Sequence, residues 1–111
     1  MTKRICIFAV ILMLCFGMLI PTHAASPRLV DDADLLSESE ETALTEKLDT
    51  ASMELGFDLV VVTTFDTDGL SSRDYADDYF DYNGYGFGTN HDGALLLIDM
   101  QNRVVWLSTS G

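Results

Sequence analysis

Apolar and polar positions recur along the chain with helical spacing in some stretches, and this pattern predicts the first helix. The apolar residues of this stretch follow one another at steps of four, three and four residues, at Leu44, Leu48, Ala51 and Leu55. Ser37 and Glu40 stand before it with the spacing of a capping box, and Gly56 follows it, where a helix end is expected. The sequence therefore predicts a helix over residues 39–55.

Three aliphatic runs are typical of β-strands, and a second helix lies between the first two. Residues 59–65 form a β-branched run with the composition of a strand buried on both faces. Residues 72–82 predict a helix with aromatic side chains on one side, and the glycine-rich residues 83–92 predict a loop. Residues 93–98 and 103–109 predict two strands that pair antiparallel. These three strands and two helices indicate an α/β fold with a small core.

The first residues of the chain have the layout of a secretory signal peptide. A basic start is followed by an apolar run of 16 residues at positions 5–20 and then by small residues. This run is shorter than the roughly 20 residues that a membrane-spanning helix needs. We expect residues 1–24 to be removed after Ala24, or alternatively after Ala25. The protein is then exported, to the cell envelope or the extracellular space.

Residues 25–111 are strongly acidic and contain no cysteine. They hold all 18 acidic residues of the chain against four basic ones, Arg28, Lys47, Arg73 and Arg103. Nucleic acid is excluded as a partner, because this charge repels its phosphates, whereas cations and basic partners are favoured. The lack of cysteine excludes disulfides, thiol catalysis and zinc sites of the cysteine type.

Four aspartates lie at helical spacing on one side of the predicted second helix, at Asp74, Asp77, Asp78 and Asp81. Like charges at this spacing oppose helix formation by about 0.2–0.5 kcal/mol per pair. A divalent cation would compensate, and calcium prefers carboxylate and carbonyl oxygens. The plainer interpretation is a solvated outer face. Within the stripe, Asp81 is the best candidate ligand, because it is nearest to the glycine-rich loop.

Residues 81–92 partly match the twelve-residue calcium loop of an EF-hand. The matching positions are Asp81, Asn83, Gly86 and Asp92. Tyr85 stands where Asp or Asn belongs, Asp92 replaces the usual glutamate, and a strand follows instead of a helix. The EF-hand interpretation therefore fails, although an oxygen-rich loop that holds calcium in another geometry remains a hypothesis.

The order and spacing of several motifs resemble the TPM domain family. The motifs are VDDADLLS at residues 30–37, GFDLVVVT at 56–63, YADDYF at 75–80, GYGFG at 84–88 and HDG at 91–93. The last corresponds to the family's Asp-(Asn)-Gly motif before a buried strand, but here Gly93 follows Asp92 directly and the asparagine is missing. The resemblance covers nearly all of residues 25–111 and the first two-thirds of the family domain. We therefore expect a truncated copy, which agrees with a sequence that stops just after a strand.

The resemblance implies properties that the residues alone do not show. TPM domains have a central sheet with helices around it, occur outside the cytoplasm and are often joined to a C-terminal membrane helix. Some bacterial members bind calcium, and some thylakoid members are associated with photosystem II repair and an acid phosphatase activity. If the acidic site of the family carries over, the matching metal ligands here are Asp32, Asp81 and Asp92.

Two functions of different classes stay open at this point. In the first, the protein is a non-catalytic module that binds calcium and an envelope or membrane protein. In the second, it is a metal-assisted acid phosphatase acting on phosphomonoesters, with Asp92 orienting water or acting as base. The lack of a basic clamp near the glycine segment favours the binding module. A third interpretation is that the acidity serves solubility alone.

Overall fold

The computed structural model describes residues 26–111, so the predicted signal peptide at residues 1–24 lies outside the described residues. The elements follow one another as β1 (Leu29–Asp31), α2 (Glu38–Leu55), β2 (Asp58–Thr64), α3 (Ser72–Tyr82), β3 (Gly93–Asp99) and β4 (Val104–Ser110). In this part of the chain no helix has the length and apolar character needed to cross a membrane.

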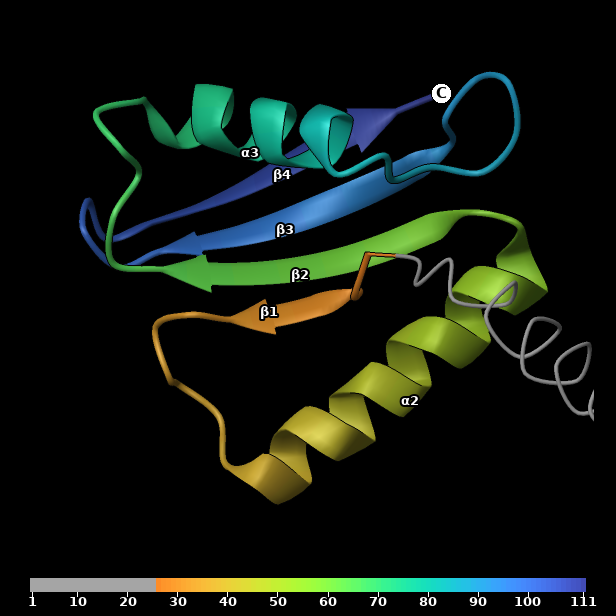
Figure 1. The fold of residues 1–111 in the computed structure, drawn as a ribbon, viewed down its shortest axis with the longest axis horizontal. Coiled ribbons are helices and arrows are strands. Elements are labelled where there is room, and N and C mark those ends of the chain that lie inside the picture. Colours follow the sequence, from red (N-terminus) through yellow and green to blue (C-terminus); the bar gives the residue numbers. More distant parts are fainter. Residues whose placement is uncertain (1–25) are drawn as a thin grey trace, which may run out of the picture.

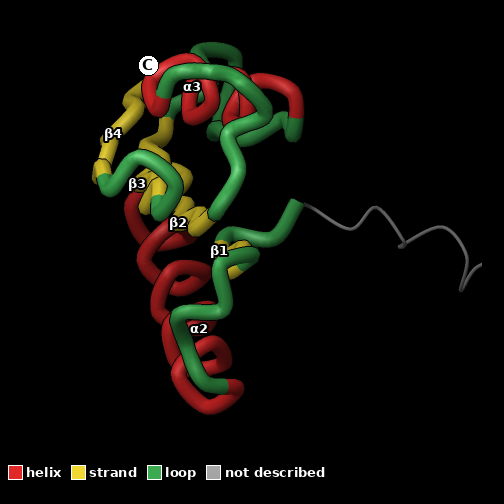
Figure 2. Tube along the Cα trace, turned by 90° about the vertical axis from the view of Figure 1, so that its left-hand side faces the viewer, coloured by secondary structure: helices red, strands yellow, loops and turns green. Residues whose placement is uncertain are grey.

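The strands form one mixed sheet in the order β1-β2-β3-β4 (Figure 1). β1, β2 and β3 are parallel, and β4 returns antiparallel to β3, which confirms the predicted antiparallel pair. Parallel neighbours need long connections, and each connection here contains a helix. Figure 2 shows that α2 and α3 lie on opposite sides of the sheet. The α/β class with helices around a small sheet is therefore confirmed.

The hydrophobic core lies between the sheet and α3. It consists of alternate residues of β2 and β3 with three residues of α3 and the loop after it: Val60, Val62, Leu95, Leu97, Ala76, Phe80 and Tyr85. Because successive side chains of a strand point to opposite faces, burial alternates along β3 and through most of β2. β2 was predicted to be buried on both faces, but it is fully buried mainly on one face. Phe65 lies beyond its end, with 58% of its surface exposed.

Local signals define both ends of α2. The Ser37 hydroxyl accepts a hydrogen bond from the backbone N–H of Glu40, and the Glu40 carboxylate accepts one from the N–H of Ser37. This is the predicted capping box. Gly56 ends the helix in the left-handed region at φ 60°, where glycine is favoured.

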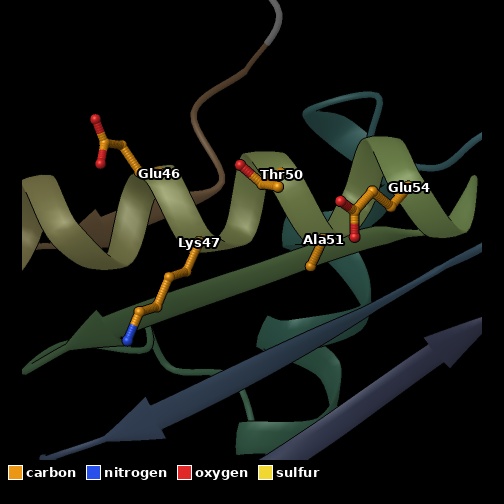
Figure 3. Close-up of a pocket in the computed structure, with 5 residues that line it drawn as sticks. All are labelled: Glu46, Lys47, Thr50, Ala51 and Glu54. Atoms are coloured by element: carbon orange, nitrogen blue, oxygen red, sulfur yellow. The ribbon is translucent and has the colours of Figure 1, made fainter.

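One side of α2 packs against the sheet less completely than the predicted apolar stripe suggested. Leu55, the last residue of that stripe, is 67% exposed, whereas Ser52 is fully buried and its hydroxyl accepts a hydrogen bond from Leu59 N–H at 2.9 Å. An open hollow of about 470 Å³ runs along the helix, where Lys47 and Ala51 point toward the sheet (Figure 3). α2 contacts β1 and β2 but neither β3 nor β4.

β1 is an addition to the three strands that the sequence predicts. It pairs with β2 from Leu29 opposite Val61 to Asp31 opposite Thr63. A strand of three residues has too few positions to display alternation, so the pattern could not show it. Its effect is to place Asp31 at the edge where the parallel strands end, here called the carboxyl edge.

Candidate metal centre

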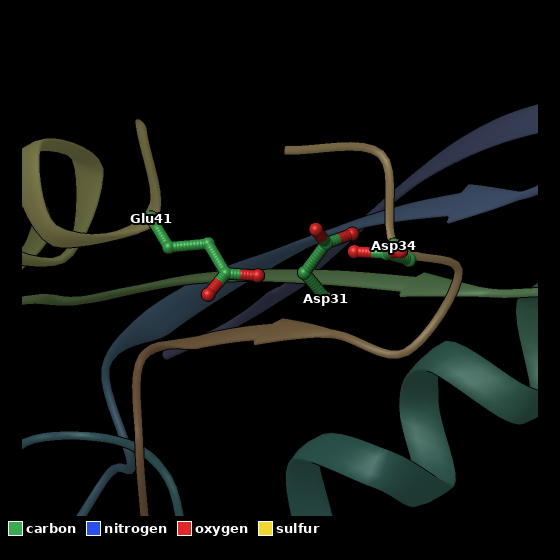
Figure 4. A group of neighbouring side chains, drawn as sticks. All are labelled: Asp31, Asp34 and Glu41. Carbon is green, nitrogen blue, oxygen red and sulfur yellow. The ribbon is translucent and has the colours of Figure 1, made fainter. Parts of the chain in front are cut away.

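Three carboxylates meet at the carboxyl edge, between β1 and α2. Asp31 ends β1, Asp34 lies in the connection that follows, and Glu41 is in the first turn of α2. One oxygen from each lies within 4.8 Å of the others, and Figure 4 shows Asp31 between the other two. Among residues 26–111, this is the acidic group with a geometry suited to a metal ion. We call it the acidic cluster.

Asp31 also organises the connection from β1 to α2. One of its oxygens accepts hydrogen bonds from Leu35 N–H at 3.0 Å and from the Thr63 hydroxyl at 2.6 Å. The other accepts a hydrogen bond from Leu36 N–H at 2.8 Å. Partial desolvation opposes ionisation of Asp31, but these hydrogen bonds, led by that of Thr63, outweigh it and lower its pKa. The carboxylate is therefore held ionised and in one place.

Glu41 has a raised pKa in the folded protein. Partial desolvation raises its pKa, and the hydrogen bond to Asp31 and the charges of Asp31, Asp34 and Glu38 raise it further. An opposite charge placed between these groups would lower that pKa again. The cluster thus has the electrostatics of a site that a cation relieves.

The ligand set of the acidic cluster suits a hard cation. Calcium takes six to eight oxygen ligands in flexible geometry, and carboxylates are prominent among them. Asp34 is exposed, and Asp31 and Glu41 are half-buried, so water has access to the rest of a coordination shell. Asp34 itself has φ 52°, a left-handed conformation that aspartate tolerates better than most residues. Its N–H donates to the Asp31 carbonyl at 3.1 Å, which fixes its distance from β1.

Asp32, the first of the ligands predicted from the resemblance, is next to the cluster in sequence but on the other side of the sheet. Its charge helps to raise the pKa of Tyr79 in α3, after the larger effect of desolvation. Its carboxylate therefore lies on the α3 side. Asp31 instead shares a site with Glu41 of α2. Asp32 lies beyond the end of β1, in the turn closed by the hydrogen bond from Asp34 N–H to the Asp31 carbonyl, and it is not one of the three residues whose oxygens converge.

Asp81 and Asp92, the other two predicted ligands, lie at the opposite, amino edge of the sheet. Asp81 is near the end of α3 and borders a hollow of about 260 Å³ with Ser110. Asp92 directly precedes β3, and its carboxylate fills the space beside Gly111. Strands of seven residues separate the two edges by roughly 20 Å. The structure thus brings Asp81 and Asp92 to one edge and Asp32 to the other, and calcium binding by these three residues stays a prediction.

The acidic stripe of α3 is offset in part by protein groups. Asp77 accepts a hydrogen bond from the Ser108 hydroxyl at 2.5 Å, and its second oxygen lies 3.9 Å from Arg73 Nε. Asp74 is in the first turn, where the Ser71 hydroxyl caps its N–H and the helix dipole favours negative charge. These contacts offset part of the repulsion among the aspartates. The sequence alone had suggested a cation for this role.

Sequence reasoning missed an ion pair that fixes the glycine-rich loop. Asp58 is 7% exposed; one oxygen accepts a hydrogen bond from Arg28 Nε at 2.5 Å and the other from Gly86 N–H at 2.8 Å. Arg28 also donates to Asp49 of α2 at 2.8 Å. Desolvation lowers the pKa of Arg28, but the bonds to and charges of both aspartates outweigh it and raise that pKa overall. These residues are far apart in sequence, so no local motif predicts their contacts.

In a comparison with known protein families, residues 29–111 match the family model described as TPM domain. Among curated proteins, the chain is similar to UPF0603 protein YdjH of Bacillus subtilis (strain 168), with 38% identity over 82 residues. This match includes 70% of the chain but spans only 29% of the length of that relative.

Among solved structures, the chain is similar to the N-terminal domain of a protein from P. gingivalis, determined by solution NMR. The TM-score is 0.66 at 24% sequence identity, and the match covers 77% of this chain and 54% of the other. This likeness supports the fold. The family model covers nearly all the described residues, from the start of β1 to Gly111. The chain therefore belongs to the TPM domain family.

Proposed function

We propose that this TPM domain binds calcium through Asp31, Asp34 and Glu41, and that it works as a non-catalytic binding module outside the cytoplasm. The observation that carries the proposal is the approach of three carboxylate oxygens to within 4.8 Å of one another. Like charges at such distances repel, and a divalent ion between them replaces this repulsion by attraction. Carboxylate oxygens are also the ligands that calcium prefers.

The hydrogen bonds around the acidic cluster link binding to the order of the connection between β1 and α2. Asp31 already receives the N–H groups of Leu35 and Leu36, just before the helix begins. A cation held by Asp31 and Glu41 would join the end of β1 to the first turn of α2. Because a ligand that binds only the folded state stabilises it, calcium should raise the melting temperature.

Export and a protein partner complete the proposal. The basic, apolar and small-residue layout of residues 1–24 supports export. The 18 acidic residues against four basic ones in residues 25–111 favour a basic partner, because complementary charge speeds association. An envelope or membrane protein with a basic surface fits this requirement.

Calorimetric titration of CaCl₂ into the metal-stripped protein tests the site. We expect binding heat and a raised melting temperature, both lost or strongly reduced in Glu41→Gln and Asp34→Asn. Glu54→Gln, an exposed glutamate at the far end of the same helix, is the matched control and should bind as the parent does. Asp31 is a poor test, because its carboxylate also holds the connection together.

Three outcomes would contradict the proposal. Unchanged binding in both Glu41→Gln and Asp34→Asn would remove the ion from the acidic cluster. Loss of binding in Asp92→Asn, with binding retained in Glu41→Gln, would move the ion to the glycine segment. A folded sample that gives no binding heat and no melting shift would mean that the cluster is a group of surface acids without a bound ion.

The same samples test the phosphatase alternative. Phosphoryl transfer requires positive groups to stabilise charge on the phosphate. The ion pairs formed among residues 26–111 engage Arg28 and Arg73, and none of them includes a member of the acidic cluster. We therefore expect no calcium-dependent hydrolysis of p-nitrophenyl phosphate, and turnover that is lost in Glu41→Gln would overturn the non-catalytic assignment.

A further inference from the structure

A hollow of about 220 Å³ lies along one side of α3, and no member of the acidic cluster lines it. The residues that line it come from the connection between β2 and α3, from α3 itself and from the position after the helix: Asp68, Leu70, Tyr75, Asp78, Tyr79, Tyr82 and Asn83. Three of them are tyrosines, two are aspartates and none is basic. Pockets for drug-sized ligands have volumes of roughly 300–1,000 Å³, so this hollow suits a single side chain better than a large cofactor.

The hollow is on the side of α3 that is turned away from β4. Asp77 marks the side that contacts β4, because it accepts a hydrogen bond from the Ser108 hydroxyl. Tyr75 and Tyr79 are each two positions from Asp77, which on a helix of 3.6 residues per turn places them nearly opposite to it. Both tyrosines pack against the core together with Val30 of β1. The shape of the hollow therefore depends on α3 and the connection before it.

Two of the tyrosine rings are held in place by their neighbours. Tyr79 stacks on Tyr85, with ring centroids 6.4 Å apart and an angle of 17° between the planes, and Tyr75 lies 5.9 Å from Tyr79 on the same measure. Tyr85 is itself buried, and its hydroxyl donates a hydrogen bond to the carbonyl of Pro27. A wall that is ordered in advance loses little conformational freedom when a ligand binds. The faces of tyrosine rings also attract cations.

The charge around the hollow is negative. Neither Asp68 nor Asp78 takes part in an ion pair among residues 26–111. The charge of Asp32 also acts at Tyr79, where it adds to the larger effect of desolvation in raising the pKa of the phenol. Asp78 is thus a member of the acidic stripe of α3 whose charge is not offset by a basic group in the described part of the chain.

We propose that this hollow binds an arginine side chain of a basic protein partner, with its guanidinium against the tyrosine rings and the carboxylates of Asp68 and Asp78. A guanidinium is planar, stacks on aromatic faces and donates paired hydrogen bonds to carboxylates, and it is more weakly hydrated than an ammonium. An anionic group would be repelled by both aspartates. This inference rests on the basic partner of the proposed function and names the place where that partner attaches, but it does not depend on calcium binding at the acidic cluster.

Titration with a short arginine peptide, followed by two-dimensional ¹H–¹⁵N NMR, tests the hollow, because the method measures weak binding and shows where it occurs. The probe is acetyl-glycyl-arginyl-glycine amide. We expect shifts concentrated at the amides of Leu70, Tyr79, Tyr82 and Asn83. The same peptide with citrulline in place of arginine has nearly the same shape without the charge, and it should bind at least about tenfold more weakly.

Two substitutions in the lining test the contacts. Asp78→Asn and Tyr82→Leu should each raise the Kd of the arginine peptide at least about threefold, because the first removes a carboxylate and the second an aromatic face. Tyr82 is 85% exposed, so its replacement should leave the fold intact. Glu54→Gln makes the same change of net charge as Asp78→Asn at an exposed position of α2, on the other side of the sheet (Figure 2), and should leave the Kd unchanged. Circular dichroism verifies that every variant is folded.

The outcomes separate this proposal from the proposed function. Equal binding of the arginine and citrulline peptides, or no response to the arginine peptide, would overturn it. Arginine-dependent shifts that lie elsewhere, or that are unchanged in both lining variants, would also overturn it but would leave a basic partner standing. Calcium binding is measured on the same variants and should be unaffected, so failure at the hollow is distinguishable from failure at the acidic cluster.

Discussion

Replacement of Thr63 by valine should loosen the connection between β1 and α2. Thr63 is 2% exposed, and its hydroxyl donates to Asp31 Oδ1 at 2.6 Å and accepts from Ala33 N–H at 3.1 Å. Valine has nearly the same shape, so the substitution removes two hydrogen bonds with little change in packing. The effect therefore isolates what the hydroxyl contributes.

The expected loss of stability can be worked out from these two contacts. A hydrogen bond to a charged group contributes about 1.5–3 kcal/mol, and the lower end applies because Asp31 is partly exposed. A buried N–H left without a partner costs about 1–3 kcal/mol, and Ala33 is 4% exposed. One hydroxyl makes both contacts, so the terms do not simply add. We expect the free energy of unfolding to fall by about 2–3 kcal/mol.

Urea denaturation followed by circular dichroism measures this loss. Thr50→Val, at an exposed position of α2, is the control and should change stability by less than about 0.5 kcal/mol. The pKa of Asp31 is lowered in the folded state, so its contribution is present above the ordinary value of 3.8 and is lost as pH falls through the folded pKa. The difference between Thr63→Val and the parent should therefore shrink in acid. A difference at neutral pH no larger than that of the control would refute the reasoning.

Three further substitutions test the packing, the backbone and the electrostatics. Leu97→Ala, at a fully buried position, should lower the free energy of unfolding by about 2–5 kcal/mol in urea denaturation, and a loss below 1 kcal/mol would contradict the assigned core. Gly86→Ala should be more destabilising than Gly88→Ala. Both glycines have positive φ, but only at Gly86 would the new Cβ lie 2.5 Å from backbone atoms of His91. Equal melting temperatures of the two variants would contradict this. Desolvation acts to raise the pKa of Asp99, but its hydrogen bonds, led by the one from Ser72, outweigh this effect and lower the pKa overall. The stability that ionised Asp99 contributes is therefore lost as pH falls through its folded pKa. Ser72→Ala should therefore flatten the acid side of the stability profile, and an unchanged profile would contradict the assignment.

Helix ends could be predicted from the sequence because they depend on residues a few positions apart. Ser37 with Glu40 and then Gly56 are such signals, and the structure has the predicted contacts at both ends of α2. The antiparallel pairing of β3 with β4 was equally local, because only a short turn separates the two strands.

None of the three members of the acidic cluster was among the ligands predicted from the resemblance. The resemblance directed attention to Asp32, whereas Asp31 is the residue that shares a site with Glu41. Recognition of β1 would have supplied the missing signal, because the carboxyl ends of parallel strands meet at one edge. Three residues are too short to show that strand in the pattern.

Surface exposure was the least predictable property. A helical stripe tells which residues share a face, but not whether another element covers that face. Leu55 continues the stripe of α2 yet is 67% exposed, because α2 packs on β1 and β2 only. The contacts of Arg28 with Asp58 and of Asp58 with Gly86 join three distant segments, and only the folded topology brings them together.

Calcium titration followed by two-dimensional ¹H–¹⁵N NMR is the most direct test of the proposed ion site, because it reports where the ion binds. The account predicts calcium-dependent shifts concentrated at the amides of Asp34, Leu35, Leu36 and Glu41. Shifts confined to residues 81–92, or a folded spectrum that does not respond to calcium, would contradict it.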